Sequence, residues 1–283
     1  MTVPGAWPAL TVRESRSSGH ALTVWPPESS APSGLPFHRH RKYVNGSRRT
    51  GSRPYTRTRS CLGSSVVPAR VRAVLLDAPD LAGLHEAAVV FNGFAGADTS
   101  WSRLVETSAP GLNLGKAAHR ELLLRWLNSW GCRIRYPRDG EPAPFDTGIA
   151  AWWRAWRAAL PPVSLVHLSD HDIDQAASAY AALSATVVGP RRTLGPTAAA
   201  KALFALRPAA IVPWDAAIAT RLHGGRDRAA FHRHLRLGRA WAAAIIAEAG
   251  GDEAGVAEIV GRPGMSVAKI LDEYLYVTIS MIR

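Results

Sequence analysis

From about residue 71 to the C-terminus, apolar side chains recur at the three- and four-residue spacing of helices that bury one face. No stretch shows the strict alternation of a β-strand, and no fixed-period repeat is present. The pattern predicts an all-α fold, with one compact multi-helix domain over residues 71–283. A domain of this size buries most of its apolar surface.

Polar residues at the heads of these stretches predict where helices begin, because a side-chain oxygen can accept a hydrogen bond from the first-turn backbone. Glycine and proline mark where they end, at Gly131, Pro161 and Gly224 among others. Helices are expected to begin near Asp80 and at Asp227, and the N-caps that we expect are Asp98 or Thr99, Asn113, Asp146, Ser169, Asp215 and Ser266. Trp126 and Trp130 fall on one helical face, which favours core packing over a ligand role.

Residues 1–70 differ from the rest of the chain in composition. They contain 11 Ser, 8 Pro, 6 Gly and 11 Lys or Arg, and no periodicity persists there. Ordering such a segment loses backbone entropy with little burial to offset the loss, so the segment is predicted to be disordered. Three further interpretations are open: a nucleic-acid-binding arm, an organelle transit peptide, or translated sequence upstream of a true start near Val66 or Val71. We favour the last.

The formal net charge of +12 resides mainly in that segment, which has 11 basic and 2 acidic residues. Residues 71–283 contain 23 basic and 20 acidic residues, so the predicted domain is nearly neutral. Two cysteines without CxxC spacing exclude a disulfide framework and indicate a reducing, cytoplasmic location. No apolar run is long enough to cross a membrane.

A cluster of His and Asp at residues 167–174 has the composition of a metal site. Ser169 followed by Asp172 also has the spacing of a capping box, and acidic residues suit the first turn of a helix. We prefer the capping interpretation. The sequence therefore indicates no metal site and no cofactor.

Several short motifs together resemble a family of bacterial hypothetical proteins to which no activity is attached. The resemblance covers roughly residues 71–283. The motifs are Trp126-Leu127-Asn128, Trp130-Gly131-Cys132-Arg133, Gly195-Pro196-Thr197, Pro213-Trp214-Asp215, Gly261-Arg262-Pro263, Asp272-Glu273-Tyr274 and Val277-Thr278-Ile279.

Residues 194–222 carry a second resemblance, to the helix-hairpin-helix and catalytic-aspartate region of DNA base-excision glycosylases. It implies a glycosylase-like helical fold that acts on DNA and cleaves the N-glycosidic bond of a flipped base. Asp215 falls on the family's catalytic aspartate, where a carboxylate stabilises the charge that develops at C1′. Trp214 beside it is expected to wall the substrate pocket, and Asp215 is equally expected to cap its helix.

Two positions depart from the glycosylase pattern. The family's hairpin offers glycine N–H groups to a DNA phosphate, whereas Pro196 has no N–H. Thr197 aligns with the lysine of bifunctional members, and Lys201 lies one helical turn later. Schiff-base lyase chemistry is therefore not expected.

Two functions remain open from the sequence. The first is a DNA-associated protein of glycosylase-like fold, which a pocket at Asp215 flanked by Trp214 and by Arg191, Arg192 or Lys201 would favour. The second is a non-enzymatic helical module that binds an unidentified protein partner, which an Asp215 sealed under other side chains would favour.

Overall fold

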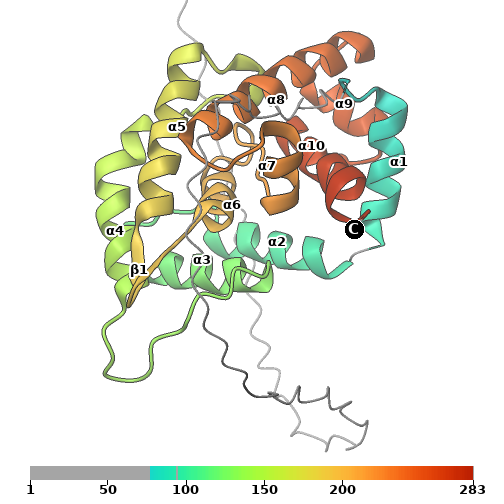
Figure 1. Cartoon of the computed structure of the whole chain (residues 1–283). Coiled ribbons are helices and arrows are strands. Elements are labelled where there is room, and N and C mark those ends of the chain that lie inside the picture. Colours follow the sequence, from blue (N-terminus) through green and yellow to red (C-terminus); the bar gives the residue numbers. More distant parts are fainter. Residues whose placement is uncertain (1–76, 94, 283) are drawn as a thin grey trace, which may run out of the picture. The chain divides into compact units, whose positions relative to one another are not determined.

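The structure is a computed structural model that describes residues 77–93 and 95–282 of the chain. Within these ranges the chain is mostly helical, as predicted (Figure 1). The prediction of disorder for residues 1–70, and its three alternatives, concern residues outside the described ranges. The α-helices are α1 (Leu81–Asn92), α2 (Ala95–Ser108), α3 (Ala117–Ser129), α4 (Pro144–Trp156), α5 (Asp170–Ala185), α6 (Pro196–Leu206), α7 (Ala216–His223), α8 (Arg228–Ala249), α9 (Glu253–Ile259) and α10 (Val267–Leu275). Three short helical segments complete them: the 3-10 turns η1 (Arg157–Ala159) and η2 (Leu165–His167), and the π-helical turn η3 (Tyr276–Ser280).

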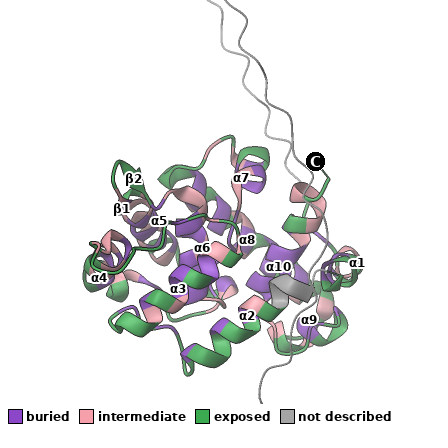
Figure 2. Ribbon diagram, turned by 90° about the horizontal axis from the view of Figure 1, so that it is seen from below, coloured by how far each residue is buried: buried purple, intermediate pink, exposed green. Residues whose placement is uncertain are grey.

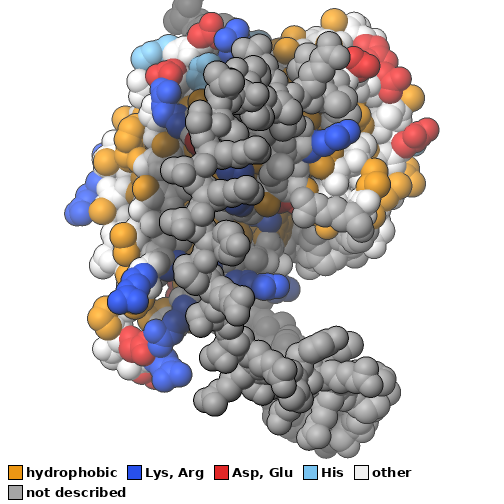
Figure 3. Space-filling view, in the orientation of Figure 1, with side chains coloured by type: hydrophobic (Ala, Val, Ile, Leu, Met, Phe, Trp, Pro, Cys, Tyr) orange, Lys and Arg blue, Asp and Glu red, His pale blue; other side chains and the backbone are white. Residues whose placement is uncertain are grey.

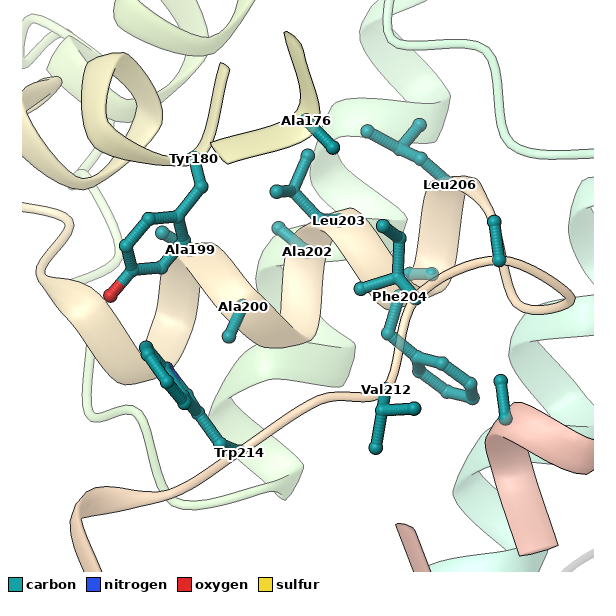
Figure 4. Close-up of a cluster of buried hydrophobic side chains, with 14 of the residues drawn as sticks. Ala176, Tyr180, Ala199, Ala200, Ala202, Leu203, Phe204, Leu206, Val212 and Trp214 are labelled. Carbon is teal, nitrogen blue, oxygen red and sulfur yellow. The ribbon is translucent and has the colours of Figure 1, made fainter. Parts of the chain in front are cut away.

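Helix α6 lies at the centre of the described domain. Its residues from Ala198 to Leu206 are buried apart from the half-buried Lys201, so the helix is enclosed on nearly all sides. Five alanines in this helix allow its neighbours to approach closely, as the side chains around it show (Figure 4). A helix that is apolar around its whole circumference is stable only inside the protein. This explains why α6 lies in the hydrophobic core.

The other helices surround α6. Helix α5 packs against both α6 and α8, and α3 packs against α6 on one side and α2 on the other. Helix α10 contacts α1, α8 and α9, and continues directly into η3. The buried faces of these helices point inward, and the exposed faces form the outside of the domain (Figure 2).

The expected cap of α10 and the expected starts of α1 and α8 are confirmed. Ser266 accepts a hydrogen bond from the backbone N–H three residues on, and Asp80 and Asp227 do the same at the starts of α1 and α8. Ser169 and Asp172 form the reciprocal capping box expected from their spacing. Residues 167–174 therefore serve as the start of α5.

Three expected caps are wrong because the helices begin elsewhere. Helix α2 begins at Ala95, so Asp98 and Thr99 both lie inside it. Asn113 accepts a hydrogen bond from Gly115 N (2.9 Å) and stabilises the turn before α3. Asp146 lies within the first turn of α4, where its carboxylate accepts hydrogen bonds from Nε and Nη2 of Arg120.

The prediction that the domain contains no β-strand is also wrong. The connection between α5 and α6 contains an antiparallel pair, β1 (Val187–Gly189) and β2 (Arg192–Thr193), with Val187 opposite Thr193. These strands are too short to give a periodic signal. The sequence also gave no expectation of a helix at α9. Within the described ranges, no helix combines the length and hydrophobicity required to span a membrane.

Candidate functional site

Asp215 lies at the junction of the extended segment after α6 and the first turn of α7. Its Oδ1 accepts hydrogen bonds from Ala217 N (2.7 Å) and Ile218 N (2.9 Å), which is the N-cap arrangement that the sequence predicts. Its Oδ2 accepts a hydrogen bond from the hydroxyl of Ser280 in η3 at 2.7 Å. The residue is half-buried, so the carboxylate is fixed in orientation without being fully enclosed.

Trp214 points into the interior of the described domain. Its side chain is 1% exposed and packs against Tyr180, Phe231 and His234, with ring centroids 5.0–5.7 Å apart. The close-up shows Trp214 near Tyr180, on the inner side of the segment (Figure 4). Trp214 therefore anchors the backbone that holds Asp215, and it lines none of the described pockets.

Lys201 extends from α6 toward the end of α3. Its Nζ donates a hydrogen bond to Trp130 O at 2.9 Å and lies 5.1 Å from the centroid of the Trp130 ring. Lys269 of α10 lies 5.8 Å from the same ring. Two ammonium groups thus lie within cation–π distance of one half-buried tryptophan.

Lys269 belongs to a cluster of four buried charged side chains that the apolar pattern does not predict, namely Arg262, Lys269, Asp272 and Glu273. Lys269 Nζ lies 3.2 Å from Asp272 Oδ2 and 3.1 Å from Glu273 Oε1. Arg262, from the loop before α10, forms an ion pair with Glu273. The four charges sum to zero, and their mutual attraction offsets part of the free energy that is lost when they are removed from water.

Asp272 links this buried cluster to Asp215 and Lys201. Burial raises the pKa of the Asp272 carboxyl, and Lys269 opposes that increase. Lys201 also lowers this pKa, and the charge of Asp215 raises it, so both groups lie near enough to act on Asp272. Lys201, in the middle of α6, and Asp215, at the start of α7, therefore both act electrostatically on Asp272.

Arg191 and Arg192 lie in the hairpin between α5 and α6, and Arg192 contacts the loop after α3. Arg192 is exposed and donates a hydrogen bond to Cys132 O at 3.2 Å, whereas Arg191 is exposed at the turn with a positive φ of 55°. Burial raises the pKa of the Cys132 thiol, while Lys201 and Arg192 lower it. Cys132 therefore lies between Lys201 and Arg192. Thr197 is half-buried in the first turn of α6, and no described hydrogen bond involves its hydroxyl.

The half-buried His223 and the buried His234 pack against Trp214. His223 Nε2 and His234 Nδ1 are 3.0 Å apart and share one hydrogen bond. Burial lowers the pKa of His223 to about 4 and that of His234 to about 3, so both rings are neutral at pH 7. Neighbouring carbonyls of Val212 and Pro213 act to raise the pKa of His234.

The described part of the chain contains no group of three or more His, Cys, Asp or Glu side chains arranged to hold a metal ion. The polar groups that contact Asp215 are instead two backbone amides and the hydroxyl of Ser280. A carboxylate oriented in this way can stabilise a positive charge that develops on a substrate. No family model, curated protein or solved structure matches this chain, so the function must be inferred from this geometry.

Proposed function

We propose that the protein is a DNA-associated enzyme of glycosylase-like fold that hydrolyses an N-glycosidic bond with Asp215 as its catalytic carboxylate. The observation that carries the proposal is that the two carboxylate oxygens of Asp215 have different hydrogen-bond partners. Oδ1 is held by two backbone amides, and Oδ2 is held by a single hydroxyl that can rotate away. The backbone amides thus fix the orientation of the carboxylate. A substrate can displace the Ser280 hydroxyl and so come into contact with Oδ2.

The chemistry requires few groups. The bond between C1′ and the base nitrogen breaks, and the departing base takes both bonding electrons and then a proton. Asp215 stabilises the positive charge left on the sugar, and water adds to C1′ and releases a proton. No amine attacks the sugar in this scheme, in agreement with the hydrogen bond that ties Lys201 to Trp130 O.

DNA binding is assigned to the hairpin before α6. Gly195 and Pro196 cannot both offer backbone N–H groups to a phosphate, because proline has none. Arg191 and Arg192 instead present exposed guanidinium groups, and Arg133 lies exposed in the loop that Arg192 contacts. Guanidinium groups bind phosphate oxygens in a bidentate manner, so side chains take the place of the amides.

Excision assays on the full-length chain test the proposal. Duplexes that contain uracil, an alkylated purine or an A·G mismatch are incubated with the wild type and with Asp215→Asn, and abasic product is measured. We expect product from at least one duplex with the wild type and a loss of about 100-fold or more with the variant. Excision that is unchanged by the substitution would remove Asp215 from the mechanism.

The hairpin is tested separately by the salt dependence of DNA binding. The slope of log Kd against log salt should fall by about 2 when Arg191 and Arg192 are both replaced by alanine. Alanine at the exposed Arg221 and Arg236 of α7 and α8 makes the same charge change and should leave the slope nearer the wild-type value. Equal effects of the two double variants would refute the assignment to the hairpin.

A non-enzymatic interaction module is the second candidate. The inward orientation of Trp214 favours it, because the aromatic pocket wall expected of an enzyme is absent from the described pockets. This candidate predicts no excision of any base by the wild type. It also predicts that Asp215→Asn changes stability alone.

A further inference from the structure

A cavity of about 340 Å³ lies between α2 and the end of α6, away from the residues assigned to catalysis. Its apolar walls include Trp101, Leu104, Leu112 and Leu206. A second hollow of about 520 Å³ adjoins it and shares Trp101, Val105 and Pro208 with it. The volume of the first cavity falls within the range of about 300–1,000 Å³ that is common for small-molecule sites.

One charged side chain, Arg207, lines this cavity. Among the described residues, Leu206 O is the one acceptor for its guanidinium (2.8 Å from Nη1), and its Nε is buried without a partner. A guanidinium carries five N–H donors, so most of them have no acceptor in the described part of the protein. Among the described residues no carboxylate forms an ion pair with Arg207, and burial lowers the pKa of its guanidinium.

A half-buried cation that lacks a counter-ion is unfavourable in the free protein, and an anion in the cavity would relieve that cost. The position of Arg207 at the end of α6 offers a partial alternative, because the helix dipole favours a cation there. The dipole and one carbonyl leave the remaining N–H groups unsatisfied, however. The apolar walls would take up the uncharged part of the same ligand.

We infer that this cavity binds a small monocarboxylate with an aromatic or aliphatic body, its carboxylate on Arg207 and its body against Trp101 and Leu104. A single guanidinium matches one carboxylate, and no second cation lines the cavity. Lys269 lines the adjoining hollow but is paired with Asp272 and Glu273, and Glu106 there would repel an anion. A phosphate or a dicarboxylate is therefore a poorer fit. The lining includes neither Asp215 nor Lys201, so the site is independent of the proposed catalysis.

Calorimetric titration with a matched pair of ligands tests the inference. The pair is 2-naphthylacetate and 2-naphthylacetamide, which have nearly the same shape and differ in charge. We expect the full-length wild type to bind the carboxylate at least tenfold more tightly than the amide. Arg207→Met keeps the side-chain stem and should remove that preference, whereas Arg221→Met, at an exposed arginine of α7, should retain it.

A second variant locates the site without altering the charge. Val105 lines both hollows and is 49% exposed, so Val105→Trp can obstruct the cavity without disturbing the core. It should weaken the binding of both ligands at least tenfold. Thermal melting of each variant checks that it is folded, and the neutral Arg207→Gln replaces Arg207→Met if the latter is not. Equal binding of the two ligands to the wild type, no binding of either, or a preference that survives substitution of Arg207 would overturn the inference.

Discussion

The buried charges of α10 give a prediction whose size follows from the structure. Lys269 lies 3.2 Å from Asp272 and 3.1 Å from Glu273, and its side chain is 2% exposed. At an effective dielectric constant of about 20, each contact supplies about 5 kcal/mol of attraction before desolvation is subtracted. Lys269→Met removes the positive charge that contacts both carboxylates and leaves Arg262 as the ion-pair partner of Glu273. Because loss of one partner from a buried ion pair costs about 3–5 kcal/mol, we expect a destabilisation of that size and a Tm lower by about 10 °C.

Urea unfolding of the wild type and Lys269→Met, at neutral pH and at about pH 5, measures this effect. Burial raises the folded-state pKa of Asp272 and Glu273, and loss of Lys269 should raise both further. An acid with a raised folded-state pKa adds stability at low pH and loses it as pH rises through that pKa. The difference between variant and wild type should therefore shrink at the lower pH.

Two further variants make the interpretation specific. Lys116→Met, at an exposed position before α3, should change stability by no more than about 0.5 kcal/mol. Lys269→Met combined with Asp272→Asn restores a net charge of zero and should recover at least about 1 kcal/mol relative to Lys269→Met alone. A loss below about 1 kcal/mol for Lys269→Met, or an equal loss at both pH values, would refute the reasoning.

The histidine pair and one close backbone contact give the remaining predictions. Because His223 and His234 have folded-state pKa values of about 4 and about 3, well below the ordinary 6.5, the unfolded chain binds more protons below pH 6.5, and stability should fall with pH from there. Urea unfolding should show His234 contributing about 2 kcal/mol of that loss by pH 5, and His234→Asn should make the pH profile shallower; an unchanged profile would contradict this. Gly148 packs so closely on the β1 segment that an added Cβ would lie 2.7 Å from Val187 O and 2.8 Å from Thr186 Cγ2. Gly148→Ala should therefore lower the free energy of unfolding by about 1–3 kcal/mol in the same assay. No loss of stability would contradict this and show that the β1 segment can move to accommodate the methyl group.

The helices could be predicted because their signals are local. Apolar spacing and capping side chains lie within one or two turns of each other, so Asp80, Ser169 and Ser266 mark helix starts without knowledge of the fold. Asn113 and Asp146 misled because the same side chains also stabilise turns and accept hydrogen bonds from arginine. Strands of two or three residues carry no periodic signal at all.

The candidate site was predictable in part. The position of Asp215 at the head of α7 follows from its capping role, but the direction of Trp214 depends on α5 and α8, which lie far away in sequence. The burial of the charged side chains of α10 could not be predicted either, because it also depends on residues that are distant in sequence. Lys269, Asp272 and Glu273 have the spacing of a solvent-facing stripe, and only packing against Phe91 and Trp130 shows that this stripe is buried.

The central claim is that Asp215 acts on a substrate rather than only on its own helix. Asp227 provides a matched control, because it caps α8 through a hydrogen bond from Ala230 N at 2.7 Å, and asparagine is an equally good N-cap. The most direct measurement is the single-turnover excision rate of Asp215→Asn and of Asp227→Asn on a duplex that the wild type processes. The account predicts a loss of about 100-fold or more for Asp215→Asn, with DNA affinity retained, and a rate close to wild type for Asp227→Asn. Equal rates for the two variants would contradict it.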